Sequence, residues 1–192
     1  STPKPSSAAS DVYKRQSLAI SENLYYNNHN KIVQGRDSMV TVADVKARVQ
    51  EVQELPEKLL FVVGGAGSGK SKLLREVERA EDYTYVEAKE LLMEKLFEME
   101  NEERKVEAKE SFVKAFKALA ADIVILDGVE ILFAPIFKLE PLEIIKKLSQ
   151  DHTIIVGWRG SFDGKTLKLE HNSKENYFSF DIDDPKQVIT LD

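Results

Sequence analysis

A strand, a glycine-rich loop and the start of a helix follow one another in the stretch FVVGGAGSGKSKLL, Phe61 to Leu74. Residues 58–63 form a short apolar run of the kind that a buried parallel strand requires. The eight residues from Gly64 to Ser71 match the pattern G-x-x-x-x-G-K-[ST]. Such a match between a strand and a helix is far rarer than a lone glycine-rich turn. This stretch therefore predicts a loop that binds phosphate groups.

Each residue type in this loop has a chemical reason. The four glycines allow backbone angles closed to other residues, so that successive N–H groups can turn inward on an anion. The helix that begins near Gly69 points its positive end at the same anion. Lys70 adds a mobile positive charge for the outer phosphates, and the Ser71 hydroxyl can ligate magnesium. We therefore predict a site for ATP with Mg²⁺. The residues expected to contact the nucleotide are Gly64, Gly65, Ala66, Gly67, Ser68, Gly69, Lys70, Ser71 and Lys72.

Composition narrows the class of protein. The chain has 192 residues, of which 42% are hydrophobic, enough for one domain with one sizeable core. No run approaches the roughly 18 apolar residues of a membrane span, and the first residues lack a signal-peptide layout, so we expect a cytoplasmic protein. The absence of cysteine excludes disulfides, thiolate metal sites and cysteine nucleophiles. The formal net charge of −6 argues against general nucleic-acid binding, although a local basic face leaves direct DNA binding open.

Residues 1–38 differ from the rest of the chain because they are polar and have no apolar periodicity. Residues 1–16, STPKPSSAASDVYKRQ, resemble run-on translation of adapter sequence at the ends of assembled reads. GRDSM, residues 35–39, can be encoded by purine-rich codons upstream of an ATG, as in a bacterial ribosome-binding site. Our hypothesis is that residues 1–38 are a disordered or non-native extension and that Met39 starts an ATPase domain, residues 39–192. The alternative is a natural disordered tail.

From Thr41 onward, helical and strand-like patterns alternate. Thr41 and Asp44 can form a capping box for a helix that ends at Leu55, and Pro141 suits the first turn of a later helix. Residues 87–120 read as helical with a break near Asn101. Strands separated by helices predict an α/β fold, a mostly parallel sheet with helices on both faces. Further strands are expected at 83–88, 122–128 and 153–158, and at least one of the segments 165–171, 176–182 and 187–191 should extend the sheet.

Ligands of open parallel sheets bind beyond the carboxyl ends of the strands, so residues there are the candidates for chemistry. Asp127 ends the apolar run DIVILDG, and a carboxylate there can hold magnesium, as in a Walker B element. Glu130 can orient an attacking water, although a solvated glutamate is the alternative. Arg159 leaves the fourth strand where it can sense a γ-phosphate, and a plain surface arginine is equally consistent. The predicted catalytic residues are thus Lys70, Glu130 and Arg159, and the metal ligands are Ser71 and Asp127.

The run LDGVEILFAPIFKLEPLEIIKKLSQDHTIIVGWRG, together with GGAGSGKS, resembles the BrxF family, the small P-loop proteins of type 3 BREX bacteriophage-defence systems. The resemblance covers roughly residue 42 to the end. It implies nucleotide binding by Gly64, Gly69, Lys70 and Ser71, and metal binding by Asp127. It also implies partners from a multi-protein system: a large P-loop ATPase, a PglZ-type protein, a DNA methyltransferase and a helicase. The extension before Met39 departs from the family pattern.

These observations together predict a minimal P-loop NTPase domain in which the Walker B strand is not adjacent to the Walker A strand and no helical lid is present. The expected activity is magnesium-dependent ATP binding with slow hydrolysis, in an ATPase that regulates or assembles a defence complex. Homo-oligomerisation is possible. One alternative is a small-molecule or nucleoside kinase, although beyond Arg159 the sequence has no arginine for a lid. The other is a nucleotide-dependent scaffold without useful turnover.

Overall fold

The computed structural model describes residues 39–92, 96, 99–171 and 174–191. The chain divides into two units after Ser38, and the second unit begins at Met39. The predictions made for residues 1–38 therefore lie outside the described residues. Within the described part of the chain, no helix is both long enough and apolar enough to cross a membrane.

A parallel sheet forms the centre of the fold. Its strands lie in the order β2-β3-β4-β1-β7, and every neighbouring pair in this series is parallel. The strand β4 separates β1, which precedes the glycine-rich loop, from β3, which ends in Asp127, so the predicted separation of these two strands is confirmed. The five strands are β1 (Leu59–Gly64), β2 (Thr84–Glu87), β3 (Ile123–Asp127), β4 (Thr153–Phe162) and β7 (Val188–Thr190).

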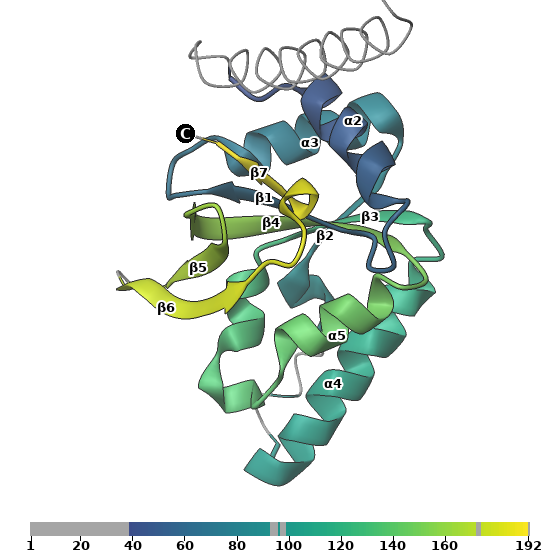
Figure 1. Ribbon diagram of the computed structural model, residues 1–192. Coiled ribbons are helices and arrows are strands. Elements are labelled where there is room, and N and C mark those ends of the chain that lie inside the picture. Colours follow the sequence, from purple (N-terminus) through teal and green to yellow (C-terminus); the bar gives the residue numbers. More distant parts are fainter. Residues whose placement is uncertain (1–38, 93–95, 97–98, 172–173, 192) are drawn as a thin grey trace, which may run out of the picture. The chain divides into compact units, whose positions relative to one another are not determined.

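Helices cover both faces of this sheet (Figure 1). The helices α2 (Val42–Val52) and α3 (Lys70–Glu81) lie on one face, and α4 (Asn101–Ala118) and α5 (Pro141–Leu148) lie on the other. All six residues of β1 are buried, because successive side chains point to opposite faces and each face has its own apolar cluster. The α/β fold with a mostly parallel sheet is thus confirmed.

The helix α2 begins as predicted and ends early. Thr41 Oγ1 accepts from the Asp44 N–H at 3.4 Å, and Asp44 Oδ2 accepts from the Thr41 N–H at 2.8 Å, which completes the capping box. The helix stops at Val52 rather than Leu55, and the Leu55 N–H donates to Val52 O at 3.0 Å. This bond spans three residues rather than four, so the last turn has tightened before Pro56.

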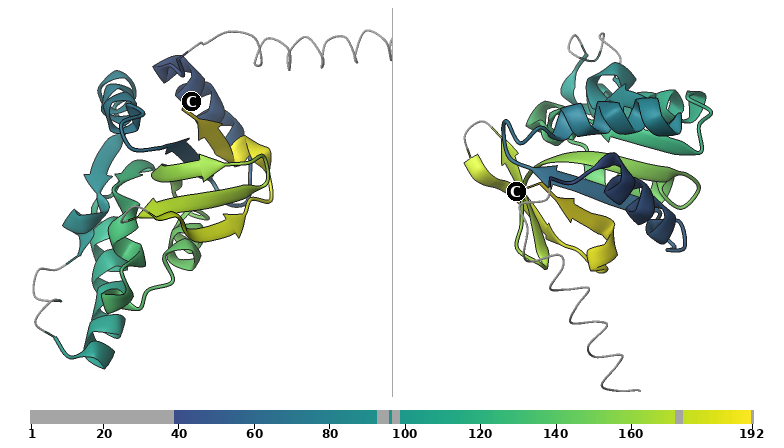
Figure 2. Two further views of the ribbon diagram at one scale, coloured as in Figure 1. Left: turned by 90° about the vertical axis from the view of Figure 1, so that its left-hand side faces the viewer. Right: turned by 90° about the horizontal axis from the view of Figure 1, so that it is seen from above.

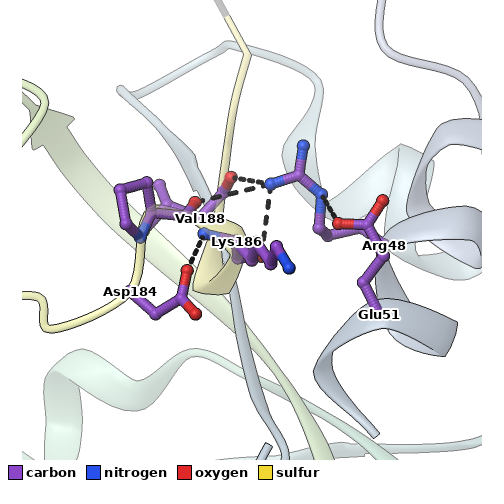
Figure 3. Close-up of polar contacts among 6 residues, drawn as sticks. Arg48, Glu51, Asp184, Lys186 and Val188 are labelled. Atoms are coloured by element: carbon purple, nitrogen blue, oxygen red, sulfur yellow. Dashed lines mark hydrogen bonds and ion pairs between the residues drawn. The ribbon is translucent and has the colours of Figure 1, made fainter. Parts of the chain in front are cut away.

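An arginine of α2 holds the C-terminal segment against the sheet (Figure 3). Arg48 Nη1 donates to the carbonyl oxygens of Pro185, Lys186 and Val188 at 3.2 to 3.4 Å. These residues belong to the 3₁₀ turn η5 (Pro185–Gln187) and to β7. One guanidinium thereby satisfies three carbonyl groups at the start of the strand that pairs with β1.

Beyond the parallel sheet, β4 continues into an antiparallel extension. Its last residues pair with β5 (Thr166–His171), which in turn pairs with β6 (Lys174–Asp181), as the green-to-yellow strands in Figure 2 show. The strand β4 is therefore longer than the predicted 153–158, because its second half gains a partner that the apolar pattern does not reveal. All three predicted C-terminal segments form strands, and among the described residues after β4 there is no α-helix that could act as a lid.

The prediction of helix across residues 87–120 is wrong at residues 87–92, and for residues 93–95, 97 and 98 it lies outside the described residues. The strand β2 is followed by a 3₁₀ turn, η1 (Ala88–Leu91), and α4 begins only at Asn101. Ala88, Leu91 and Leu92 are all buried in the larger apolar cluster. Burial of consecutive apolar residues in the core outweighs their helical propensity, which is only a weak preference.

Candidate functional site

The loop between β1 and α3 has the form expected for anion binding. The N-cap residue of α3 is Gly69, whose lack of a side chain leaves the helix N-terminus uncapped. The Leu73 N–H is the donor that bonds Gly69 O, at 3.0 Å. The N–H groups of Lys70, Ser71 and Lys72 therefore have no carbonyl partner within α3 and are available, with the positive helix end, to an anion.

Two of the four loop glycines have the backbone angles that only glycine adopts freely. Gly67 has φ +79° and Gly69 has φ +83°. Gly64 is needed for a different reason, because a Cβ there would lie 2.4 Å from Ser68 Oγ. At Gly65 an added Cβ meets nothing within 4 Å. The expectation that all four glycines serve backbone freedom is thus confirmed for two of them.

Asp127 is the most heavily bonded side chain of the site. It is 4% exposed, and its Oδ1 lies 3.3 Å from Nζ of Lys70, which is 8% exposed. The same oxygen accepts from the Gly128 N–H at 2.9 Å, and Oδ2 accepts from the Tyr85 hydroxyl at 2.9 Å. Burial acts to raise the pKa of Asp127, but the Lys70 charge and the hydrogen bonds from Ser71, Tyr85 and Gly128 together hold that pKa below its ordinary value. The carboxylate is therefore ionised at neutral pH.

Gly157 of β4 makes room for this carboxylate. A Cβ at position 157 would lie 2.3 Å from Asp127 Oδ1 and 2.9 Å from Leu74 Cδ1. Sequence reasoning missed Gly157, because a single glycine inside an apolar strand carries no sign of what faces it. Only the pairing of β3 with β4 in the structure shows that Gly157 faces the Asp127 carboxylate.

All of the predicted site residues except Gly64 lie around one cleft of about 600 Å³ at the carboxyl ends of the strands. Ser71, Asp127, Glu130 and Arg159 all contribute to its wall. Sequence reasoning missed three further wall residues whose side chains carry chemistry, namely Arg75, Tyr85 and Glu87. The loop residues in the wall are Gly65, Ala66, Gly67, Ser68, Gly69, Lys70, Ser71 and Lys72.

Glu130 and Arg159 reach the cleft from different elements. Glu130 lies in the 3₁₀ turn η3 (Val129–Phe133) that follows β3, and it is half-buried. Arg159 is in register with Gly64, where β4 leaves the parallel sheet, and its Nη2 lies 3.3 Å from Oε1 of Glu170 on β5. Its buried Nε has no hydrogen-bond partner among the described residues, so this guanidinium retains a donor that a further acceptor would satisfy.

The donors present suit magnesium. Among the described residues, no group of three or more His, Cys, Asp or Glu could hold a metal ion by protein ligands alone. Magnesium instead takes hard oxygen ligands, commonly one or two carboxylates together with substrate phosphates and water. The Ser71 hydroxyl and the Asp127 carboxylate are such ligands, and they interact directly with each other beside the phosphate loop. They are the residues that would hold the ion.

Comparison with known proteins yields little. No protein-family profile matches the sequence, and no curated protein is similar enough to match. Among solved structures, PCH-2 from C. elegans aligns with a TM-score of 0.38 and 17% sequence identity. The aligned part covers 62% of this chain and 36% of that chain, so the protein studied here spans well under half of PCH-2. A likeness at this level has no bearing on function.

Proposed function

We propose that this protein binds ATP with Mg²⁺ in the cleft and hydrolyses it slowly. The observation that supports this most directly is the convergence of Lys70, Ser71 and Asp127 beside an uncapped helix end, with β1 and β3 separated by β4. Each of these features serves a polyphosphate: the helix end and the lysine supply positive charge, and the two oxygen ligands suit the accompanying cation.

The protein's own residues have distinct tasks in this proposal. The loop N–H groups bind the phosphate chain, and Lys70 moves from Asp127 Oδ1 to the outer phosphates, which exchanges one charged partner for another. Magnesium, when bound by Ser71 and Asp127, neutralises negative charge on the β- and γ-phosphate oxygens. Glu130 orients a water, and Arg159 donates to the terminal phosphate. Positioning and charge stabilisation account for most of the catalysis in this kind of transfer.

Substitution of Lys70 tests the proposal. Lys70→Met keeps the buried aliphatic stem but removes the charge, so we expect the Kd for ATP, measured by calorimetry with Mg²⁺, to rise about 10- to 100-fold. Lys46→Met is the matched control, because Lys46 also pairs with a carboxylate, Glu81 at 2.7 Å, but lies on α2 away from the cleft. Unchanged affinity in Lys70→Met would refute nucleotide binding by this loop.

Loss of the Lys70 charge should also reduce stability. Asp127 would remain buried without its ion pair, and breaking a buried pair costs about 3–5 kcal/mol. The hydrogen bonds from Tyr85 and Gly128 remain, so we expect a loss near the lower end of that range. Lys70→Met combined with Asp127→Asn should recover most of it. Thermal unfolding of the single and double variants separates this effect from the loss of binding.

Turnover distinguishes the alternatives. Release of phosphate from ATP without any added acceptor supports the ATPase, and transfer only to a small-molecule acceptor would support a kinase. Binding of ATP without either reaction would support a nucleotide-dependent scaffold.

The biological role that we propose is regulation or assembly of a BREX-type defence complex in the cytoplasm. It rests on the resemblance of two stretches of this sequence to the BrxF family, namely residues 127–160 and the loop GGAGSGKS. The expected partners are a large P-loop ATPase, a PglZ-type protein, a methyltransferase and a helicase. Genes for these proteins should neighbour the gene for this one, and a neighbourhood without a methyltransferase or PglZ-type gene would contradict the role.

A further inference from the structure

Tyr85 occupies a position that nucleotide binding by the loop does not explain. It lies in the middle of β2, in register with Ile125 of β3, and Asp127 follows two residues later on the same face of β3. The Tyr85 hydroxyl donates to Asp127 Oδ2 at 2.9 Å, and the residue also lines the cleft. A side chain from the edge of the parallel series thus reaches the carboxylate that we assign to the metal.

The two oxygens of Asp127 are held by different partners. Oδ1 is bound by Lys70 and by the Gly128 N–H, and Oδ2 is bound by Tyr85. The terminal torsion of an aspartate is broad and has no strong intrinsic preference. Without Tyr85, Oδ2 would lose this donor while Lys70 and the Gly128 N–H stay on Oδ1, so the carboxylate would be less restrained in rotation about its last bond. The phenol therefore limits the direction in which Oδ1 faces the loop.

Arg75 of α3 restrains the Tyr85 ring. Its guanidinium carbon lies 3.4 Å from the centre of the ring, and its Nη1 lies 3.3 Å from Oε2 of Glu78. A cation over the face of an aromatic ring is attracted by the ring electrons. Burial and the bond to Asp127 raise the pKa of the Tyr85 hydroxyl well above its usual range, so the hydroxyl remains a donor at every physiological pH.

We propose that Tyr85 is a positioning residue that orients Asp127 to receive the magnesium accompanying the nucleotide, and that Arg75 holds the Tyr85 ring in place. This inference rests on the proposed function, because it concerns the metal that accompanies ATP. Partners that orient a ligating carboxylate typically change metal affinity about 10- to 100-fold when they are removed. Tyr85 should therefore affect the magnesium dependence of binding rather than binding of the nucleotide itself.

Tyr85→Phe tests the inference, because it keeps the ring beneath Arg75 and removes only the hydroxyl. Binding of ATP is measured by calorimetry in EDTA and then across a magnesium titration. We expect the affinity in EDTA to stay within about twofold of wild type, while the magnesium concentration for half-maximal enhancement rises about tenfold. Tyr83→Phe is the matched control, since Tyr83 packs on the same apolar cluster. It should leave both quantities unchanged.

Arg75→Gln provides the second measurement. In the wild-type background it should raise the half-maximal magnesium concentration severalfold, and in the Tyr85→Phe background it should add nothing, because both residues act through one hydrogen bond. A magnesium titration unchanged in Tyr85→Phe would overturn the inference while leaving nucleotide binding intact. Wild-type protein that binds no ATP with or without magnesium would instead overturn the proposed function, and this inference with it.

Discussion

Asp127 receives contacts from side chains and backbone of four neighbouring elements. Lys70 comes from α3, Tyr85 from β2 and the Gly128 N–H from the turn after β3, while Gly157 of β4 leaves the space that the carboxylate occupies. A buried charge must be paired and hydrogen-bonded to be tolerated, and each of these groups meets part of that requirement. The same contacts place the carboxylate in the wall of the cleft.

Two glutamates of the cleft, Glu130 and Glu87, are candidates for orienting water in the proposed hydrolysis. Glu130→Gln should leave ATP affinity unchanged and lower turnover about 100-fold, because the amide keeps the shape but loses the charge. Glu87 is in register with Asp127 on the neighbouring strand, so Glu87→Gln is measured beside it. Glu90→Gln, at an exposed position of η1, is the control. If Glu87→Gln loses more turnover than Glu130→Gln, the task belongs to Glu87.

The pairing of β3 with β4 determines how closely the Asp127 carboxylate can approach the backbone of β4. Because Gly157 faces Asp127 without a side chain, the two strands can bring a carboxylate and a backbone within contact distance. The strand β4 then continues past the parallel sheet and pairs with β5 from Gly160 onward, and β5 carries the Glu170 that binds Arg159. One long strand therefore supplies both the space for Asp127 and the Arg159 cation in the wall of the cleft.

Gly157→Ala should disturb both β3 and the site. The added Cβ would overlap Asp127 Oδ1 and Leu74 Cδ1, and such overpacking typically costs about 1–3 kcal/mol in free energy of unfolding. Displacement of the carboxylate should also weaken magnesium-dependent ATP binding. Gly65→Ala is the control for stability, because its Cβ would meet no atom within 4 Å. Equal melting temperatures for the two variants would contradict the close approach at Gly157.

The turn between β4 and β5 should make the folded protein less stable at acid pH. Asp163 Oδ1 accepts from the Thr166 N–H at 2.8 Å and from the Lys165 N–H at 3.1 Å, and these bonds, with Lys168, hold the pKa of Asp163 below its ordinary 3.8. A depressed folded-state pKa gives stability that is present above the unfolded value and is lost as pH falls through the folded value. The melting temperature of wild type should exceed that of Asp163→Asn at neutral pH.

The difference in melting temperature between wild type and Asp163→Asn should shrink below about pH 4. There the Asp163 side chain takes up a proton and no longer differs in charge from asparagine. A difference that is constant from neutral to acid pH would show that the charge of Asp163 does not contribute to the turn.

Among the described residues, both arginines in the wall of the cleft already have carboxylate partners. Of the two arginines that line the cleft, Arg75 is paired with Glu78 and Arg159 with Glu170. In the described part of the chain after β4, only strands and a 3₁₀ turn follow, so no helix brings further charge over the cleft. Because both arginines are already paired, we propose that a further cationic group is supplied by a partner or by another copy of the chain.

Hydrolysis should consequently depend on association. An arginine supplied in trans can raise turnover about 10³-fold or more, so the isolated protein should be a weak ATPase. The rate per subunit should increase with protein concentration or on addition of the large P-loop ATPase that we propose as a partner. Turnover measured across a wide concentration range, and then with that partner, checks this expectation. A rate that is already high in dilute solution and unaffected by both changes would favour a self-sufficient enzyme such as the kinase.

The glycine-rich loop between a strand and a helix, Asp127 at a strand end and the α/β class are readable from the sequence, because they depend on local patterns. A glycine-rich match between an apolar run and a helical repeat, or an aspartate closing a buried strand, needs only neighbouring residues to be recognised. The start of α2 at its capping box is local in the same sense. The separation of β1 from β3 also agrees with expectation, although no local pattern specifies strand order.

The roles of Gly157, Tyr85 and Glu170 are decided only by the tertiary structure. Gly157 and Tyr85 lie far along the chain from Asp127, and Glu170 meets Arg159 because β5 pairs with the end of β4, so strand order and register bring each pair together. The turn at Ala88–Leu91 likewise follows from burial against distant elements, which outweighs local helical preference. Local patterns thus identify the groups that can do the chemistry, while long-range pairing determines what holds each of them in place.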